Sequence, residues 1–135
     1  MKLSRTAGYA LQATLQLAQG GSLTPVPCSQ LAADGGMPER FLLQILRNLV
    51  THGILHSARG VDGGYTLDRP ADQISILQVI EAVDGPLAAA VPESERFPEQ
   101  SQAKLREALD RVTSLTRQQL DQIKIACLLE KRNDE

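Results

Sequence analysis

The stretch SARGVDGGYTL, residues 57–67, decides the fold class of this chain. Its centre, GVDGG, contains an Asp-Gly and a Gly-Gly pair, and such pairs favour tight turns whose residues have positive φ. Residues suited to strands flank this centre on both sides. We therefore expect a β-hairpin with one strand over residues 54–59 and the other over residues 65–68, before Arg69-Pro70 interrupts the chain.

Three helices are predicted before this hairpin. Apolar side chains recur at spacings of three and four over residues 3–18, and Gly-Gly at 20–21 ends that repeat. A short helix fits residues 29–33, and a third helix runs between Pro38, which suits a first helical position, and Gly53. The third helix has the clearest apolar stripe, formed by Leu42, Ile45, Leu46, Leu49 and Val50.

Two further helices are predicted after the hairpin. Ser75 can cap a helix over residues 75–84, with Gln78 at the capping-box position. Residues 86–101 contain three prolines and no clear period, which predicts a linker. A long helix with one apolar seam is expected from Gln102 to about Glu130.

Composition agrees with a small helical protein. Hydrophobic residues make up 42% of the 135 positions and aromatic residues only 3%, so the core must be mainly aliphatic. No run of 18 apolar residues occurs, and the first residues lack the apolar stretch of a signal peptide. We therefore expect a cytoplasmic protein without a membrane span, in which Cys28 and Cys127 are reduced thiols.

The net charge of −2 by itself argues against nucleic acid, but the charge is unevenly distributed. Residues 1–70 carry six basic and four acidic side chains, a charge of +2, whereas residues 71–135 carry eight basic and twelve acidic ones, a charge of −4. Any DNA contact is therefore expected in the first half of the chain.

The order of helix, short helix, amphipathic helix, hairpin and helix is that of a winged helix-turn-helix. The fold class expected is mainly α with a small β-hairpin: this domain in residues 1–85, a linker in residues 86–101, and a dimerisation helix with its tail in residues 102–135. Polar side chains of the third helix would read a major groove, and the hairpin would contact flanking DNA. The candidate DNA-binding residues on these two elements are Arg40, Gln44, Arg47, Asn48, Arg59, Gly63 and Gly64. Two plainer interpretations stay open: a merely solvated helix face, and a glycine pair that only closes the hairpin.

Residues 2–85 resemble the Rrf2 family of bacterial transcription regulators, which includes an iron–sulfur cluster regulator, a nitric-oxide-sensitive repressor and a cysteine-metabolism repressor. The matching strings are KLS (2–4), GYA (8–10), FL (41–42) with Gln44, GIL (53–55), the hairpin stretch 57–67, and ISILQVIEAVDG (74–85). The Arg-Gly-x-x-Gly-Gly-Tyr pattern of the hairpin is the most specific of these strings.

The resemblance implies a homodimer, held by crossing long helices, that binds an imperfect palindrome. It places DNA contacts at Tyr9, Phe41, Gln44 and Arg59, although Tyr9 could equally be a core residue. The predicted dimerisation residues are Leu105, Leu109, Val112, Leu120 and Ile123. Leu43 replaces the Glu that many members carry before the Gln, so the family's operator sequences do not carry over.

No cofactor or metal is expected. Cluster-binding members of the family carry three cysteines before the long helix, whereas residues 86–104 contain none. His52 and His56 are four residues apart, but Gly53 separates them and no nearby carboxylate or thiolate completes a site.

The two cysteines have different surroundings in the sequence. Cys28 follows a proline at a helix start, and we expect it to pack as a small, partly buried residue; the alternative is a redox role, because a helix start favours a thiolate. Cys127 is expected to pack among its apolar neighbours.

Two functions compete for this sequence. The first is a sequence-specific, homodimeric DNA-binding regulator, expected to be a repressor, whose partner is double-stranded DNA and which an unknown effector could control. The second is a winged-helix protein-interaction module with a vestigial DNA face. No catalytic arrangement of residues is recognised, so an enzyme is not expected.

Overall fold

The computed structural model describes residues 1–21 and 24–130, and this part of the chain is mainly helical with one β-hairpin. Its elements in chain order are α1 (Arg5–Gly20), α2 (Cys28–Gly35), α3 (Glu39–Thr51), β1 (Leu55–Ala58), β2 (Gly64–Leu67), the 3-10 turn η1 (Ala71–Gln73), α4 (Ile76–Asp84), α5 (Glu99–Gln122) and the 3-10 turn η2 (Ile125–Leu128). Residues 131–135 of the predicted tail lie outside the described residues.

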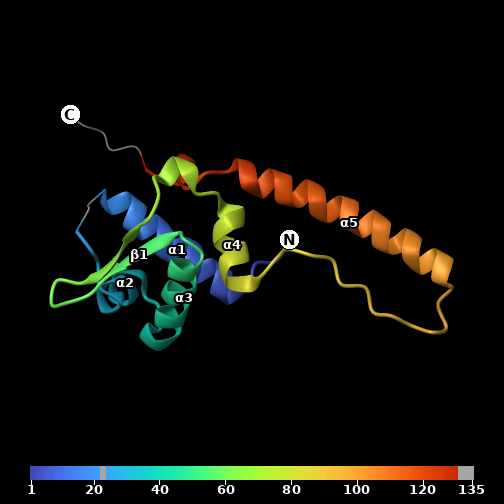
Figure 1. The fold of residues 1–135 in the computed structure, drawn as a ribbon, viewed down its shortest axis with the longest axis horizontal. Helices are drawn as coiled ribbons and strands as arrows, with labels where there is room; N and C mark the ends of the chain where they lie inside the picture. The colour runs from blue at the N-terminus through green and yellow to red at the C-terminus, as the bar shows by residue number, and fades with distance from the viewer. Residues whose placement is uncertain (22–23, 131–135) are drawn as a thin grey trace.

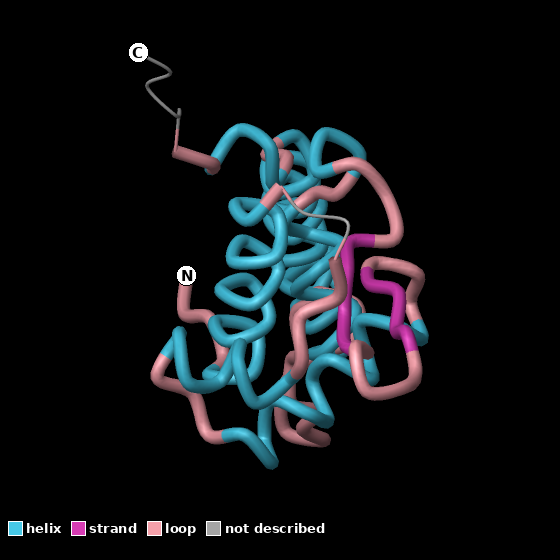
Figure 2. Tube along the Cα trace, turned by 90° about the vertical axis from the view of Figure 1, so that its left-hand side faces the viewer, coloured by secondary structure: helices cyan, strands magenta, loops and turns pink. Residues whose placement is uncertain are grey.

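Helices α1 to α4 form one body, and α5 runs away from it (Figure 1). The segment after α4, yellow in Figure 1, leads out to the far end of α5, which then returns to the body. The two strands lie together at one edge of the helical body (Figure 2). Most of α5 is therefore separate from the winged-helix body.

The first three predicted helices are confirmed, with shifted ends. α1 begins at Arg5 because the Ser4 hydroxyl accepts a hydrogen bond from the Ala7 amide, and it ends at Gly20 because the next residue, Gly21, has a φ of 57°. α2 is longer than expected at both ends. Pro38 lies just before α3 rather than inside it. Local caps, which lie outside the hydrophobic repeat, decide these ends.

The predicted hairpin is confirmed: β1 is shorter than expected by one residue at each end, and β2 has the expected length but begins one residue earlier. β1 and β2 pair antiparallel, with Leu55 opposite Leu67 and Ala58 opposite Gly64. Val26, in the segment before α2, pairs with the outer side of β2. Its amide donates to the Tyr65 carbonyl at 3.0 Å, and its carbonyl accepts from the Tyr65 amide at 2.9 Å. The hairpin is thus tied to the helix-turn-helix on its open edge.

One aliphatic core joins α1, α2, α3, the hairpin and α4. The capping box of α4 is confirmed, since the Ser75 hydroxyl accepts from the Gln78 amide at 3.1 Å and the Gln78 side chain accepts from the Ser75 amide at 3.0 Å. Leu42, Leu46 and Leu49 of α3 are fully buried in this core. Burial of that side leaves the opposite side of α3 facing outward.

The predicted long helix from residue 102 to about residue 130 is wrong at both ends. α5 begins at Glu99, inside the predicted linker, and stops at Gln122. The Ile76 amide donates to the Ile123 carbonyl at 2.9 Å, and the Ile125 amide donates to the Ile74 carbonyl at 2.8 Å. These bonds need extended backbone at Ile123, so the helix cannot continue, and Ile125 is buried in the winged-helix core.

Candidate DNA-binding surface

The exposed side of α3 carries the polar residues that the sequence pattern placed there. Arg40, Gln44 and Arg47 are exposed and Asn48 is half-buried. At about 100° per residue, Gln44 lies opposite the buried stripe, with Arg47 about 60° to one side and Phe41 about 60° to the other. Gln44 therefore forms the middle of the exposed side.

Gln44 and Asn48 are in contact along this side. The Gln44 Nε2 atom donates to the Asn48 Oδ1 atom at 3.4 Å. Residues four apart on a helix are neighbours, so this contact holds two amide groups side by side. Amide side chains can pair with the adenine edge in a major groove.

An aromatic pair connects α1 to the start of α3. The Tyr9 and Phe41 rings have centroids 5.7 Å apart and planes at 77°, an edge-to-face arrangement. Phe41 is 40% exposed, whereas Tyr9 is half-buried and packs against the core. The core interpretation of Tyr9 is thus supported, and its DNA contact stays a prediction.

The tip of the hairpin projects from the body. Arg59 is exposed, Gly60 has a φ of 109°, and the Gly63 amide donates to the Gly60 carbonyl at 3.0 Å. Val61 at the tip is fully exposed, although no sequence pattern marks it as a functional residue. Only the placement of an apolar residue in a glycine-rich turn could have drawn attention to it.

The glycine pair is needed for the fold itself. A Cβ atom on Gly63 would lie 2.4 Å from the Ala58 carbonyl oxygen, and one on Gly64 would lie 2.4 Å from the Val26 backbone. Both positions therefore exclude a side chain for steric reasons. The structural interpretation of this pair is supported, and a role in DNA contact stays a prediction.

A cavity of about 670 Å³ separates α3 from the hairpin. We call it the helix–wing cavity; its lining comes from Pro27 and Cys28 at the start of α2, Arg47, Val50 and Thr51 of α3, and residues 57–60 and 63–65 of the hairpin. Burial raises the pKa of Tyr65, the Cys28 charge adds to the rise, and the positive charge of Arg47 opposes it. The cavity is thus lined by one arginine from α3, Arg47, and by another from the hairpin, Arg59.

Cys28 does not have the environment of an activated thiol. Its Sγ atom donates to the Glu39 carbonyl at 3.7 Å. Burial raises the pKa of Cys28, and the nearby Glu39 carboxylate raises it further. A favoured thiolate, and with it the redox role, is therefore not supported, whereas the packing of Cys28 against the core agrees with the interpretation that the sequence favoured. The expected packing of Cys127 is also wrong, because that residue is exposed in η2.

The five predicted dimerisation residues do not form one exposed seam. Leu105 and Val112 are 41% and 59% exposed on α5, and Leu109 is half-buried. Leu120 is buried against Leu77 and Ile80 of its own chain. Ile123 lies after the helix, where its carbonyl is paired with α4. Leu115, which is 63% exposed and was not among the five, extends the exposed apolar side of α5 that Leu105 and Val112 form.

Comparison with known proteins decides the family. The family model named Rrf2 and described as an iron-dependent transcriptional regulator matches residues 3–131. This chain belongs to the Rrf2 family. Its winged-helix fold is thus that of a family of transcriptional regulators, and the curated relatives that it matches are described as transcriptional regulators.

Individual relatives of this Rrf2 chain agree with the family match. A protein from Mycobacterium tuberculosis, described as an HTH-type transcriptional regulator, is 47% identical over 89 residues, which cover 66% of this chain and 55% of that protein. A structure described as a transcriptional regulator from Listeria innocua has a TM-score of 0.78 at 29% identity and covers 99% of this chain and 90% of its own. CymR, described as the global cysteine regulator of B. subtilis, shares the fold with a TM-score of 0.75 at 23% identity, over 95% of each chain.

This Rrf2 chain spans about half the length of the curated relatives it matches. None of the helices in residues 1–21 and 24–130 is long and apolar enough to cross a bilayer.

The family description mentions iron, but the residues of this Rrf2 chain do not fit an iron–sulfur cluster. The chain has two cysteines, which lie in α2 and η2, and the segment between α4 and α5 has none. Across the described residues, no group of three or more His, Cys, Asp or Glu side chains is placed to hold a metal ion. His52 instead lies with its Nδ1 atom 2.8 Å from the Asn48 carbonyl at the end of α3.

Proposed function

We propose that this Rrf2 regulator binds an imperfect palindrome in double-stranded DNA as a homodimer and represses transcription there. The observation that carries the proposal is the exposed polar side of α3, centred on Gln44 and bordered by the hairpin. A helix with this placement can enter a major groove while the hairpin reaches the neighbouring DNA.

The division of labour follows from where the side chains lie. Gln44 is in the middle of the exposed side and can form two hydrogen bonds to an adenine edge. Arg40 and Asn48 lie beside it, so they extend the reading surface. Arg59 precedes the hairpin tip, where it can contact phosphates or a narrow minor groove. Base reading thus belongs to α3 and general DNA affinity to the hairpin.

The homodimer is supported by the exposed apolar residues of α5. Leu105, Leu109 and Val112 lie at spacings of four and three, and Leu115 continues the same side. An apolar helix side that extends away from its own body is typical of an interface between subunits. Two copies joined there would present two α3 helices, which fits a palindromic site.

The decisive experiment selects binding sites from randomised duplexes and then titrates Gln44→Ala against the selected site. We expect a relaxed preference at one position in each half-site, at a cost of about 1–3 kcal/mol there. Gln118→Ala on α5 is the matched control and should bind like the original protein. A reporter gene behind the selected site should be less active when the regulator is present.

The opposite result has a clear meaning. If the selection returns no preferred sequence and neither Gln44→Ala nor Arg59→Ala changes affinity for DNA, the DNA face is vestigial. The chain would then be a protein-interaction module, which the overall charge of −2 would favour.

A bound iron–sulfur cluster is not part of the proposed function, because the ligands for one are not brought together. Protein purified without oxygen should be colourless. A visible absorbance band with stoichiometric iron would contradict this expectation.

A further inference from the structure

The helix–wing cavity differs in charge from four other hollows of the described surface. Two arginines, Arg47 and Arg59, line it together with neutral residues, and no acidic side chain does. Four other hollows of about 440–660 Å³ each include an acidic residue, namely Glu93, Glu107, Glu130 and Glu81. In a chain of net charge −2, positive charge is thus concentrated at this cavity.

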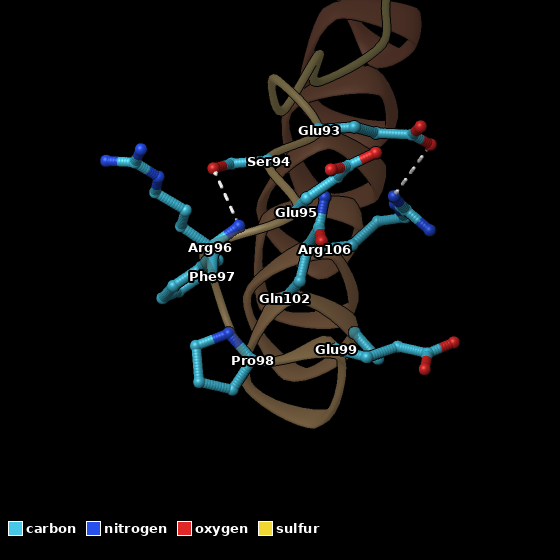
Figure 3. Close-up of a pocket in the computed structure, with 10 residues that line it drawn as sticks. Glu93, Ser94, Glu95, Arg96, Phe97, Pro98, Glu99, Gln102 and Arg106 are labelled. Atoms are coloured by element: carbon cyan, nitrogen blue, oxygen red, sulfur yellow. Dashed lines mark hydrogen bonds and ion pairs between the residues drawn. The ribbon is translucent and has the colours of Figure 1, made fainter.

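The hollow before α5 makes the contrast clear (Figure 3). Arg106 there is paired with the Glu93 carboxylate at 3.8 Å, and Glu95 and Glu99 line the same hollow. Within residues 1–21 and 24–130, neither Arg47 nor Arg59 forms an ion pair. Their charges are therefore available to a ligand.

The position of the cavity between α3 and the hairpin indicates which part of a DNA molecule would occupy it. Arg47 is turned about 60° from Gln44 toward the hairpin, given 100° per residue. When Gln44 faces a base edge in the major groove, the hairpin lies over the adjacent DNA, and the sugar–phosphate backbone passes between the two. The helix–wing cavity lies between the same two elements, and α3 and the hairpin each contribute one arginine to its lining.

We propose that the helix–wing cavity binds one phosphodiester of the DNA backbone, held between Arg47 and Arg59. The inference rests on the proposed function and gives Arg47 a different role from the base reading that the sequence suggested. Guanidinium groups suit a phosphate because they donate several hydrogen bonds in a planar arrangement. The ligand class is a backbone phosphate, so this contact contributes affinity without sequence preference.

The first test compares Arg47→Ala, Arg59→Ala and the double variant on the selected operator and on a scrambled duplex at several salt concentrations. Each single variant should weaken the operator and the scrambled complex by the same factor. It should lower the slope of log affinity against log salt by at most about 0.9 per subunit, which is the contribution of one neutralised phosphate. The double variant should lose less than the product of the two factors, because both side chains act on one phosphate. Arg111→Ala on α5 removes the same charge elsewhere and should leave the slope unchanged.

The second test removes the charge from the DNA instead. Operators carrying a single methylphosphonate are scanned along the backbone beside the major-groove contact. One position in each half-site should weaken binding by the original protein and have no further effect on the double variant. This readout does not depend on protein stability, which unfolding curves of each variant would check separately.

The outcomes separate the two proposals. No binding of the original protein to any duplex overturns the proposed function and the inference with it. Specific binding in which Arg47→Ala alters preference at one base pair, with an unchanged salt slope, overturns only the phosphate clamp. Strictly multiplicative losses, or no methylphosphonate position that depends on the two arginines, overturn it as well.

Discussion

Gly64 and Gly8 show how strongly the effect of an alanine substitution depends on the atoms around the glycine. Gly64 has a φ of 151°, and a Cβ atom there would lie 2.4 Å from the Val26 backbone. Gly8 lies within α1, and a Cβ atom there would meet nothing within 4 Å. The same substitution is therefore expected to have opposite effects at these two positions.

Gly64→Ala should lower the free energy of unfolding by about 1–3 kcal/mol or more, since it combines a strained φ with a clash against backbone. Gly8→Ala should raise that free energy by roughly 0.5–1 kcal/mol, because alanine favours a helix. Urea unfolding followed by circular dichroism measures both. A Gly64→Ala variant as stable as the original would contradict the contact between Val26 and β2.

Cys28 provides a prediction about pH. Its pKa is raised by burial and by Glu39, so less thiolate is present at neutral pH than for an ordinary thiol. In a Cys127→Ser background, alkylation by iodoacetamide should be slow at pH 7 and accelerate at higher pH. Glu39→Gln should move this acceleration to lower pH. Rapid alkylation at pH 7 would show that the thiolate is favoured after all.

The predictability of the site differs from residue to residue. The exposure of Arg40 and Gln44 follows from helix periodicity alone, because the opposite stripe is apolar. The steric need for Gly64 depends on Val26, which is distant in the sequence and has no local signal. The pKa of Cys28 likewise depends on Glu39, which belongs to the next helix. Sequence patterns thus identify faces, whereas contacts between elements decide the chemistry.

At the scale of elements, the end of α5 is the clearest difference from expectation. Leu120, Ile123 and Leu128 continue the apolar seam, and no glycine or proline interrupts it, so the sequence pattern favours one helix. Backbone hydrogen bonds to Ile74 and Ile76 end the helix instead. Pairing between segments so far apart in sequence cannot be inferred from local patterns. The helices and hairpin of the first 85 residues were predictable because each carries its own start and stop signals.

The segment after α5 should therefore stabilise the winged-helix body. Ile125→Ala removes a fully buried side chain and is expected to cost about 2–5 kcal/mol. Leu128→Ala in the same 3-10 turn is the matched control, and it should cost much less because Leu128 is 48% exposed. Thermal and urea unfolding compare the two. Equal losses would argue that Ile125 does not belong to the core.

At the scale of the whole molecule, α5 is fixed at one end and free at the other. Arg117 donates two hydrogen bonds to the Glu81 carboxylate, at 2.7 and 3.1 Å, and this pairing lowers the pKa of Glu81. The Ser75 hydroxyl donates to the Asp121 carboxylate at 2.8 Å. These contacts and buried Leu120 hold the last turns of α5 against α4, while its first turns extend beyond the body (Figure 1). A partner bound to α5 would thus have a set direction relative to α3.

The proposed dimer gives the last prediction. Val112→Asp places a charge in the middle of the exposed apolar side of α5 and should convert a dimer at micromolar concentration into a monomer, measured by sedimentation equilibrium. Ser114→Asp adds the same charge about 160° around the helix and should leave the dimer intact. Both variants should still fold, because neither residue is buried in its own chain.

The same variant tests the link between the dimer and DNA binding. On the selected operator, Val112→Asp should bind each half-site independently, and the salt dependence of its affinity should fall by about half because one subunit contacts DNA at a time. If the original protein is itself a monomer, or if Val112→Asp remains a dimer, α5 is not the dimer interface and the spacing of the two half-sites must be set by another surface.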